Sequence, residues 1–395
     1  MDDLIKYRSQ FPILENTVYM ISNSLGAMPK TVFDKMHEYA ETWATRGVRA
    51  WAEGWWELPI KAGENIAKIL NVNPGEITMH QNVTIAESII LSCFDFKGKR
   101  NKIVYTDMNF PSVMYLFEAQ KANGAKIEMV KSDDGVTVDT QKLLDAIDEE
   151  TLLVPISHVL FRSSYIQDVK AIIAKAHSVG AKVILDTYQS AGTVPVDLKA
   201  LNVDFAVGGV LKWLCGGPGG GFLYVRKDLV SELEPKFRGW QGDSDPFAFR
   251  VGEIDFKPDS WKFLNGTPAI PTLYATQEGP RIINEVGVDN IRKKSIHQTE
   301  ILIRLADENG FQVTVPRESS KRGGTVAFDL PNAYPIAREL NDRDFVIDYR
   351  PKAGIRVSPH FYTKDDELHA IVDEIKEIIK TKAYEKHLNV KSVVT

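Results

Sequence analysis

The 395-residue chain contains only two cysteines, Cys93 and Cys215, and it has no long apolar run. Two cysteines cannot make the disulfide framework of a small secreted domain. No stretch reaches the roughly 18 consecutive apolar residues that a membrane-spanning helix needs, and the first residues lack the basic segment of a signal peptide. We therefore expect no membrane partner and a cytoplasmic location.

Basic clusters are also scarce. The longest basic runs are residues 292–294 and 321–322, and the formal net charge is −5. A nucleic-acid-binding surface requires a basic patch, so we expect no nucleic-acid partner. The sequence shows no internal repeat, low-complexity tract or metal-ligand set. Its composition, 44% hydrophobic and 26% charged, is that of an ordinary globular protein long enough for two domains.

A dinucleotide-binding fingerprint is missing as well. The glycine run at residues 216–221 contains no G-x-G-x-x-G match, and it leads into an apolar strand where that motif requires a helix. Glycine instead lets the backbone pass close to another segment. A dinucleotide-dependent oxidoreductase is therefore disfavoured.

Apolar strand patterns alternate with helical patterns between residues 102 and 225, and the strands are apolar on both faces. This alternation predicts an α/β fold with a mostly parallel, doubly wound sheet. The predicted strands are residues 102–106, 126–130 and 152–156, followed by three more between 183 and 225, and the predicted helices are residues 111–122, 140–147 and 166–178.

The pattern changes after about residue 279. A long helix at 280–309, short strands and a terminal helix at 365–380 predict a smaller α+β domain at the C-terminal end. We expect a large domain at residues 15–279 and a small domain built from residues 1–14 and 280–395.

An acid and a lysine stand at neighbouring strand ends. Asp186 closes one predicted strand and Lys212 follows the next by a few residues, at the sheet edge where α/β proteins bind ligands. The pair suits pyridoxal 5′-phosphate (PLP): the lysine forms a Schiff base, and the carboxylate keeps the pyridine nitrogen protonated so that the ring withdraws electrons. Burial among Val210, Leu211 and Trp213 would lower the pKa of the amine.

Three further residues suit such a site. Thr84 lies where a polar turn opens an apolar helix, a place that binds phosphate, although it could simply cap that helix. Phe110 could stack on the pyridine ring or belong to the core. Arg356 stands between apolar residues of a predicted strand and needs a partner, either a substrate carboxylate or an internal acid.

The chain resembles the kynureninase branch of the class V, fold-type-I PLP enzymes over residues 10–380. The matching segments are residues 18–26, the tryptophan-rich stretch 51–56, 109–112, Lys212 with 216–219, 239–242 and 265–268. The resemblance implies a homodimer with shared active sites that acts on an α-amino acid, a small-molecule substrate whose side chain stays open. The resemblance implies that Lys212 forms the Schiff base, that Asp186 pairs with the pyridinium nitrogen and that Phe110 stacks on the ring. The phosphate would be contacted by Asn82, Val83, Thr84 and Trp240 and, from the second subunit, by Thr267. The substrate would be contacted by Asn23, Ser24 and Arg356.

The chain departs from kynureninases at three positions. Val113 replaces an Asp, Gln189 replaces a His, and Leu211 replaces a Tyr that is a phosphate ligand and candidate proton donor. Gln189 looks instead like the glutamine that contacts the cofactor's 3′ oxygen in cysteine desulfurases and epimerases. The loop at residues 347–354, however, lacks the cysteine that a desulfurase needs. L-Kynurenine is therefore predicted to be a poor substrate.

These observations predict a PLP enzyme in which Lys212 removes the Cα proton of an α-amino acid. Cleavage at Cβ, hydrolytic or eliminative, is the first expectation by family. Class V transamination is the alternative, and desulfurase-like or epimerase chemistry comes after it.

Overall fold

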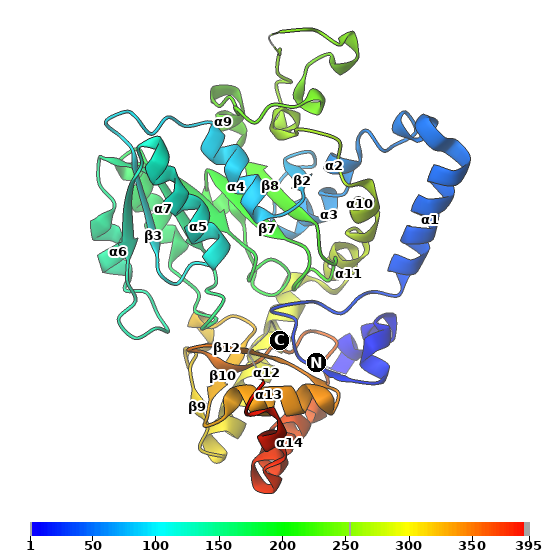
Figure 1. The fold of residues 1–395 in the computed structure, drawn as a ribbon, viewed down its shortest axis with the longest axis vertical. Coiled ribbons are helices and arrows are strands. Elements are labelled where there is room, and N and C mark those ends of the chain that lie inside the picture. Colours follow the sequence, from blue (N-terminus) through cyan, green and yellow to red (C-terminus); the bar gives the residue numbers. More distant parts are fainter. Residues whose placement is uncertain (1, 253, 391–395) are drawn as a thin grey trace.

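A seven-stranded sheet forms the centre of the molecule in the computed structural model, which describes residues 2–252 and 254–390 (Figure 1). The strand order is β2-β8-β7-β6-β5-β3-β4. Only β8 runs antiparallel to its neighbours, so the predicted mostly parallel α/β sheet is confirmed. The strands are β2 (Ile77–His80), β3 (Lys102–Thr106), β4 (Lys126–Val130), β5 (Thr151–Ser157), β6 (Lys182–Asp186), β7 (Phe205–Gly209) and β8 (Gly221–Val225).

Side chains of the central strands alternate between two hydrophobic cores. In β6, Val183 and Leu185 enter one core while Ile184 enters the other, and in β7 Val207 joins Ile184. Successive strand residues point to opposite faces, so Asp186 lies on the face of Ile184. The strands read as continuous apolar runs because helices cover both faces of the sheet.

Helices α4, α5 and α9 contribute to the core on the Ile184 face. The core on the opposite face contains side chains from α2, α3, α6, α7, α8, α10 and α11. Helix α1 packs on α10 at the outer edge of the molecule (Figure 1). Their bounds are α1 (Thr31–Arg46), α2 (Leu58–Lys61), α3 (Glu64–Ile69), α4 (Val83–Ser92), α5 (Pro111–Ala119), α6 (Thr140–Ala146), α7 (Val169–Ser178), α8 (Leu198–Leu201), α9 (Lys227–Glu232), α10 (Ile270–Ala275) and α11 (Glu278–Val286).

A second, antiparallel sheet of order β12-β13-β10-β9 lies below the first in Figure 1. Its own core includes residues from α12, α13 and α14, and a short parallel pair, β1 with β11, ties the N-terminal segment to it. The bounds are β1 (Val18–Tyr19), β9 (Gln312–Val313), β10 (Val326–Asp329), β11 (Phe345–Val346), β12 (Asp348–Arg350), β13 (Gly354–Val357), α12 (Val288–Glu308), α13 (Ala333–Asp342) and α14 (Asp365–Thr381).

The prediction of one continuous helix at residues 280–309 is wrong. The chain forms two helices, α11 and α12, separated at Gly287, whose φ is 83°. That left-handed conformation ends a helix and favours glycine. The predicted domain limits at residues 14/15 and 279/280 stay a prediction. Across the part of the chain that the structure describes, no helix is both long and apolar enough to span a bilayer.

Candidate active site

A cavity of about 360 Å³ lies at the carboxyl ends of β5 and β6, where residues of the second sheet approach the first. Most of the predicted site residues line it, although they come from distant parts of the sequence. The lining is Asn23, Ser24, Asn82, Val83, Thr84, Phe110, Ser112, Val113, Ser157, Val159, Phe161, Asp186, Tyr188, Gln189, Leu211, Lys212, Arg350 and Arg356.

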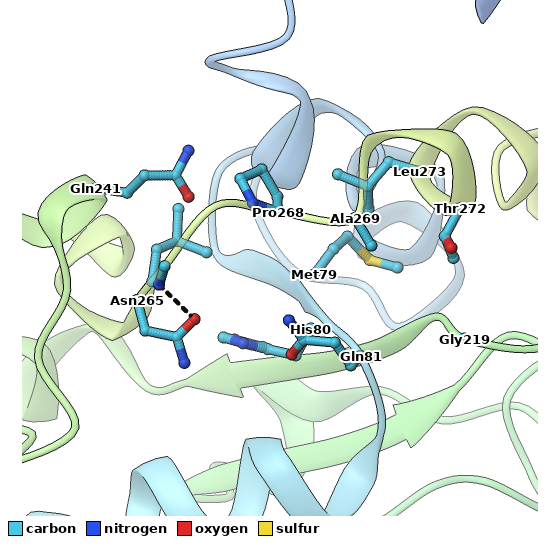
Figure 2. A pocket seen from close by; sticks show the side chains of 12 residues that line it. Met79, His80, Gln81, Gly219, Gln241, Asn265, Pro268, Ala269, Thr272 and Leu273 are labelled. Carbon is cyan, nitrogen blue, oxygen red and sulfur yellow. Dashed lines mark hydrogen bonds between the residues drawn. The ribbon is translucent and has the colours of Figure 1, made fainter.

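A second pocket, drawn in Figure 2, is far smaller. It holds about 20 Å³ between the β2 end and residues 265–273. That volume suits a single water molecule and not an amino acid. The 360 Å³ cavity is the candidate active site because it brings Lys212, Asp186 and the amino end of α4 together.

Lys212 lies in the loop that follows β7, with its amine 4.3 Å from the centre of the Tyr188 ring and 5.5 Å from that of Phe110. Burial lowers the pKa of Lys212 from 10.5 to about 8; the carboxylate of Asp186 opposes this shift and the positive charge of Arg356 adds to it. The predicted effect of desolvation is confirmed in direction. A lowered pKa makes the neutral, nucleophilic amine accessible.

The backbone around Lys212 is fixed by the N-terminal segment. The N–H of Gly26 donates to the carbonyl of Leu211 at 2.8 Å. A Cβ at Gly26 would lie 2.1 Å from the Lys212 carbonyl oxygen, so only glycine allows this approach. The same segment thus positions the lysine and brings Asn23 and Ser24 to the cavity.

Asp186 ends β6 and is buried. One carboxylate oxygen accepts the backbone N–H of Tyr188 at 2.8 Å, and the other accepts the Ser157 hydroxyl at 3.4 Å. Burial raises the pKa of Asp186, and the Tyr188 N–H, the charge of Lys212 and the Ser157 hydroxyl act against that rise. A buried carboxylate of this kind is suited to face a cationic N–H group.

The amino end of α4 opens into the cavity. Asn82 caps the helix, because its side-chain oxygen accepts the N–H of Ile85 at 3.0 Å. Thr84 is therefore not the cap, and its position within the first turn leaves it beside the free N–H groups that bind anions. A Cβ at Gly221 would lie 2.7 Å from the Asn82 carbonyl carbon, so β8 passes this turn closely.

Asn23 supplies an independent sign of a ligand. Its side chain is 1% exposed and lines the cavity, yet neither its oxygen nor its nitrogen has a hydrogen-bond partner within the described residues. Buried polar groups are normally satisfied, so a group bound in the cavity is the natural partner. The amine, carboxylate, helix end and orphaned amide together fit PLP with an amino acid.

The comparisons with known proteins identify the family. The family model described as aminotransferase class V matches residues 18–348. This chain belongs to the class V aminotransferase family. It is accordingly a PLP-dependent enzyme of fold type I.

Relatives of this class V enzyme carry more than one activity in their names. It is 30% identical to a kynureninase from Pseudomonas fluorescens, over 97% of this chain and 94% of the relative. It is also 30% identical to YcbU of Bacillus subtilis (strain 168), an uncharacterized aminotransferase, over 94% and 96%. The apo cysteine desulfurase of Thermococcus onnurineus NA1 has the same fold, with TM-score 0.85, 22% identity, and 95% and 98% coverage.

Arg356 of the class V enzyme is engaged by an internal acid. Its Nε donates to Asp348 Oδ1 at 2.8 Å, its Nη2 pairs with Asp348 Oδ2, and its Nη1 donates to the Phe161 carbonyl at 2.6 Å. The internal salt bridge that the sequence left open is therefore present. Arg356 also lines the cavity, so its predicted contact with a substrate carboxylate stays a prediction.

Arg350 is a cavity residue that sequence reasoning missed. Its Nη2 lies 3.3 Å from the same Asp348 carboxylate. Asp348 and Arg356 are paired opposite each other in β12 and β13, and Arg350 follows two residues after Asp348 on the same face. The i, i+2 spacing of Asp348 and Arg350 was the available signal, but it required recognising residues 348–350 as a strand.

Gln189 is held on both sides. Its side-chain nitrogen donates to the backbone carbonyl of Asn23 at 3.0 Å, and its side-chain oxygen accepts the indole N–H of Trp213 at 2.9 Å. Gln189 also lines the cavity, and its predicted contact with a cofactor oxygen stays a prediction.

Trp240 and Thr267 are the two predicted cofactor residues that do not line the cavity of the single chain. Trp240 is 44% exposed and donates its indole N–H to the Pro246 carbonyl. Thr267 is exposed on the segment that borders the pocket in Figure 2. Their predicted phosphate contacts would have to form with the cavity of another subunit.

Proposed function

We propose that this class V enzyme acts on an α-amino acid, removes its Cα proton through Lys212 and cleaves a bond at Cβ. The observation that carries the proposal is the position of Lys212: a buried amine of lowered pKa in the same cavity as Asp186 and the α4 amino end. PLP, when bound, supplies an electron-withdrawing ring that stabilises negative charge at Cα.

Each end of the cavity has a distinct task in this proposal. The first turn of α4, with Asn82, Val83 and Thr84, binds the cofactor phosphate through N–H groups and a hydroxyl. Asp186 accepts the ring N–H and keeps that nitrogen protonated. Lys212 takes the Cα proton as its neutral amine, which is roughly a tenth of the population at pH 7 for a pKa of about 8.

The arginine pair suits one substrate carboxylate. Arg350 and Arg356 both pair with Asp348, so one positive charge remains in excess at this end of the cavity. Three of the five N–H groups of Arg356 are engaged, which leaves two for a ligand. Asn23 and Ser24, on the opposite segment, supply polar contacts to the substrate.

The walls favour an uncharged substrate side chain. Phe110, Val113, Val159, Phe161 and Leu211 all line the cavity. Leu211 also leaves no hydroxyl at the position that precedes the lysine, where kynureninases carry a tyrosine. We therefore propose an apolar or aromatic amino acid other than L-kynurenine.

Transamination is the second candidate. It is favoured by the likeness to the B. subtilis aminotransferase at 30% identity and by the lack of the kynureninase tyrosine and histidine. Desulfurase-like chemistry has no nucleophilic thiol here, because Cys93 and Cys215 lie outside the cavity lining.

We further propose a homodimer with shared active sites. Trp56, Trp240, Phe247 and Phe249 form a contiguous aromatic cluster, in which Phe247, Phe249 and Trp240 are exposed. An exposed apolar patch of this kind marks an interface. A two-fold partner covering the cluster would bring Trp240 and Thr267 to the second cavity.

The proposed cellular location is the cytoplasm, where thiols stay reduced, in keeping with the two free cysteines.

The experiment mixes purified holoenzyme with each of a panel of amino acids. Changes in cofactor absorbance identify the substrate, and product analysis distinguishes the reactions. A released side-chain fragment with alanine or pyruvate indicates Cβ cleavage. A 2-oxo acid that retains the whole side chain indicates transamination and would overturn the first proposal.

A further inference from the structure

Tyr188 is a cavity residue to which the proposed function gives no task. It follows Asp186 by two residues, and the centre of its ring lies 4.3 Å from the Lys212 amine. Its hydroxyl group forms no hydrogen bond within residues 2–252 and 254–390. Burial raises the pKa of Tyr188 above its ordinary value, and the negative charge of Asp186 adds to this rise. The hydroxyl group therefore stays protonated and can donate to a ligand.

The phenol end of Tyr188 lies directly over Gly209, at the carboxyl end of β7. A Cβ at Gly209 would lie 2.3 Å from both the hydroxyl oxygen and Cζ of Tyr188. Any larger residue at this position would therefore displace the phenol, and the missing side chain of glycine is what gives it room. Because the ring also contacts Lys212, contacts on two sides define where the hydroxyl group lies.

The register of β7 and β8 places this phenol beside the amino end of α4. Gly209 pairs with Gly221 across the two strands, and paired Cβ positions share one face of a sheet about 5 Å apart. Val207, two residues before Gly209, joins the core that α4 enters, so this is the face that α4 covers. A Cβ at Gly221 would lie 2.7 Å from the Asn82 carbonyl carbon. Tyr188 thus covers one glycine of the pair, and the turn at Asn82 covers the other.

The proposed phosphate site at this end of the cavity needs donors on more than one side. A phosphate ester carries three acceptor oxygens, and the first turn of α4 approaches it from one side only. On the side of β7, the three residues before Lys212 are a glycine, a valine and a leucine, and none has a polar side chain. The Tyr188 hydroxyl group lies on that side, over the last residue of β7.

We propose that Tyr188 is a further cofactor-binding residue, whose hydroxyl group donates a hydrogen bond to the phosphate group of PLP opposite the first turn of α4. One side chain then serves two parts of the site, because its ring contacts Lys212 and its hydroxyl group contacts the phosphate. Gly209 and Gly221 make the arrangement possible: one admits the phenol and the other admits the Asn82 turn. This inference rests on the proposed phosphate site at α4.

The first experiment compares PLP with pyridoxal, which lacks the phosphate group. Tyr188→Phe removes the hydroxyl group and keeps the ring. Its Kd for PLP should rise by about 10- to 100-fold, the effect of one hydrogen bond to a charged group, and its Kd for pyridoxal should not change. Equilibrium dialysis of the full-length, cofactor-free protein measures both constants. Tyr115→Phe, at an exposed position of α5, is the matched control and should change neither.

Either of two results overturns the inference: an unchanged affinity of Tyr188→Phe for PLP, or an equal loss of affinity for PLP and pyridoxal. The second result would show that the hydroxyl group does not act on the phosphate.

A relocated hydroxyl group tests the position itself. Tyr188→Ala should lose the preference for PLP over pyridoxal. Adding Gly209→Ser brings a serine hydroxyl to the same place, because a Cβ at residue 209 would lie 2.3 Å from the phenol oxygen. We expect this double variant to recover the preference and Tyr188→Ala with Gly209→Ala not to recover it. Equal behaviour of the two double variants overturns the inference. If either fails to fold, Tyr188→Phe alone decides.

Thr84→Val separates a failure of this inference from a failure of the proposed phosphate site. If Thr84→Val weakens the binding of PLP but not of pyridoxal, while Tyr188→Phe has no effect, the phosphate lies at α4 and only the role of Tyr188 is wrong. If neither substitution changes the preference for PLP, the phosphate does not lie at α4, and the proposed site fails together with this role for Tyr188.

Discussion

Arg356 is clamped by Asp348, its direct opposite in the β12–β13 pair, with both side chains almost fully buried. The pairing holds the guanidinium plane at the cavity wall before any substrate arrives. A buried pair of this kind adds little net stability but strongly penalises the loss of one partner. Here it serves chiefly to orient the arginine.

Substitution of Arg356 should weaken substrate binding, whereas substitution of Asp348 should destabilise the fold. Arg356→Lys removes the fork that can bind a carboxylate with two N–H groups, so amino-acid affinity should fall by about 10- to 100-fold while PLP stays bound. Titration of cofactor absorbance with substrate measures this, and the exposed Arg304→Lys is the control. Equal affinities in the two variants would show that Arg356 is structural.

Asp348→Ala should instead destabilise the fold. It leaves Arg350 and Arg356 facing each other without a counter-ion, at a cost of about 3–5 kcal/mol in unfolding free energy. Denaturant unfolding of the variant measures the loss. A change below about 1 kcal/mol would contradict the clamp.

Lys212 should reduce the stability of the cofactor-free protein. Its pKa falls from 10.5 to about 8 on folding, so the folded state binds fewer protons than the unfolded state between these values. The unfolding free energy therefore rises with pH across this window, and the penalty is fully present below pH 8. Lys212→Met should raise the unfolding free energy by about 2–3 kcal/mol at pH 7 and by progressively less toward pH 10.5.

Denaturant unfolding of the cofactor-free protein at several pH values checks this. Lys170→Met, at an exposed position of α7, is the control and should follow the wild type at every pH. A Lys212→Met curve parallel to that of the wild type would show that the amine is not desolvated.

Leu211→Tyr with Gln189→His should raise the cleavage of L-kynurenine, because the pair restores two proton-transfer groups. Gln189→His alone should be destabilising by about 1–3 kcal/mol, since it breaks the bonds to Trp213 and Asn23. Anthranilate release measures the gain. Release by the unmodified enzyme with kcat/KM of about 10⁴ M⁻¹s⁻¹ or more would show that these departures do not exclude kynurenine.

Phe249→Glu and Thr267→Ala should separate dimer formation from phosphate binding, because Phe249 belongs to the exposed aromatic cluster and has no predicted cofactor contact. A charge in the aromatic cluster should produce monomers with little bound PLP, whereas Thr267→Ala should weaken PLP binding several-fold and leave the dimer intact. Sedimentation and equilibrium dialysis measure the two effects. Full activity of a monomer at nanomolar concentration would refute the shared site.

Much of the fold was predictable because its signals are local. Buried parallel strands such as β3 and β5 read as short apolar runs, and all three strands predicted between residues 102 and 156 are present. The third, β4, is the edge strand of the sheet and is largely exposed, so it is not apolar on both faces as predicted. The break at Gly287 was missed because helical periodicity continues on both sides of it. A single glycine inside a helical pattern does not reveal its φ.

The site was predictable where one residue type implies one chemistry. Lys212, Asp186 and the start of α4 line one cavity as expected. The clamp on Arg356, the partners of Gln189 and the second arginine were not predictable, because they depend on strand register and on contacts over 100 residues apart. The place of the Tyr188 hydroxyl group over Gly209 likewise follows only from tertiary packing.

The most direct test of the account concerns Lys212 itself. Purified Lys212→Ala should bind PLP without the absorbance band of the lysine-linked cofactor, and it should show no turnover with any amino acid that the wild-type enzyme consumes. Absorbance of the reconstituted variant beside the wild type, with borohydride reduction followed by peptide mass analysis, gives the answer. A variant that keeps the band, or a reduced wild-type adduct on another lysine, would contradict the account.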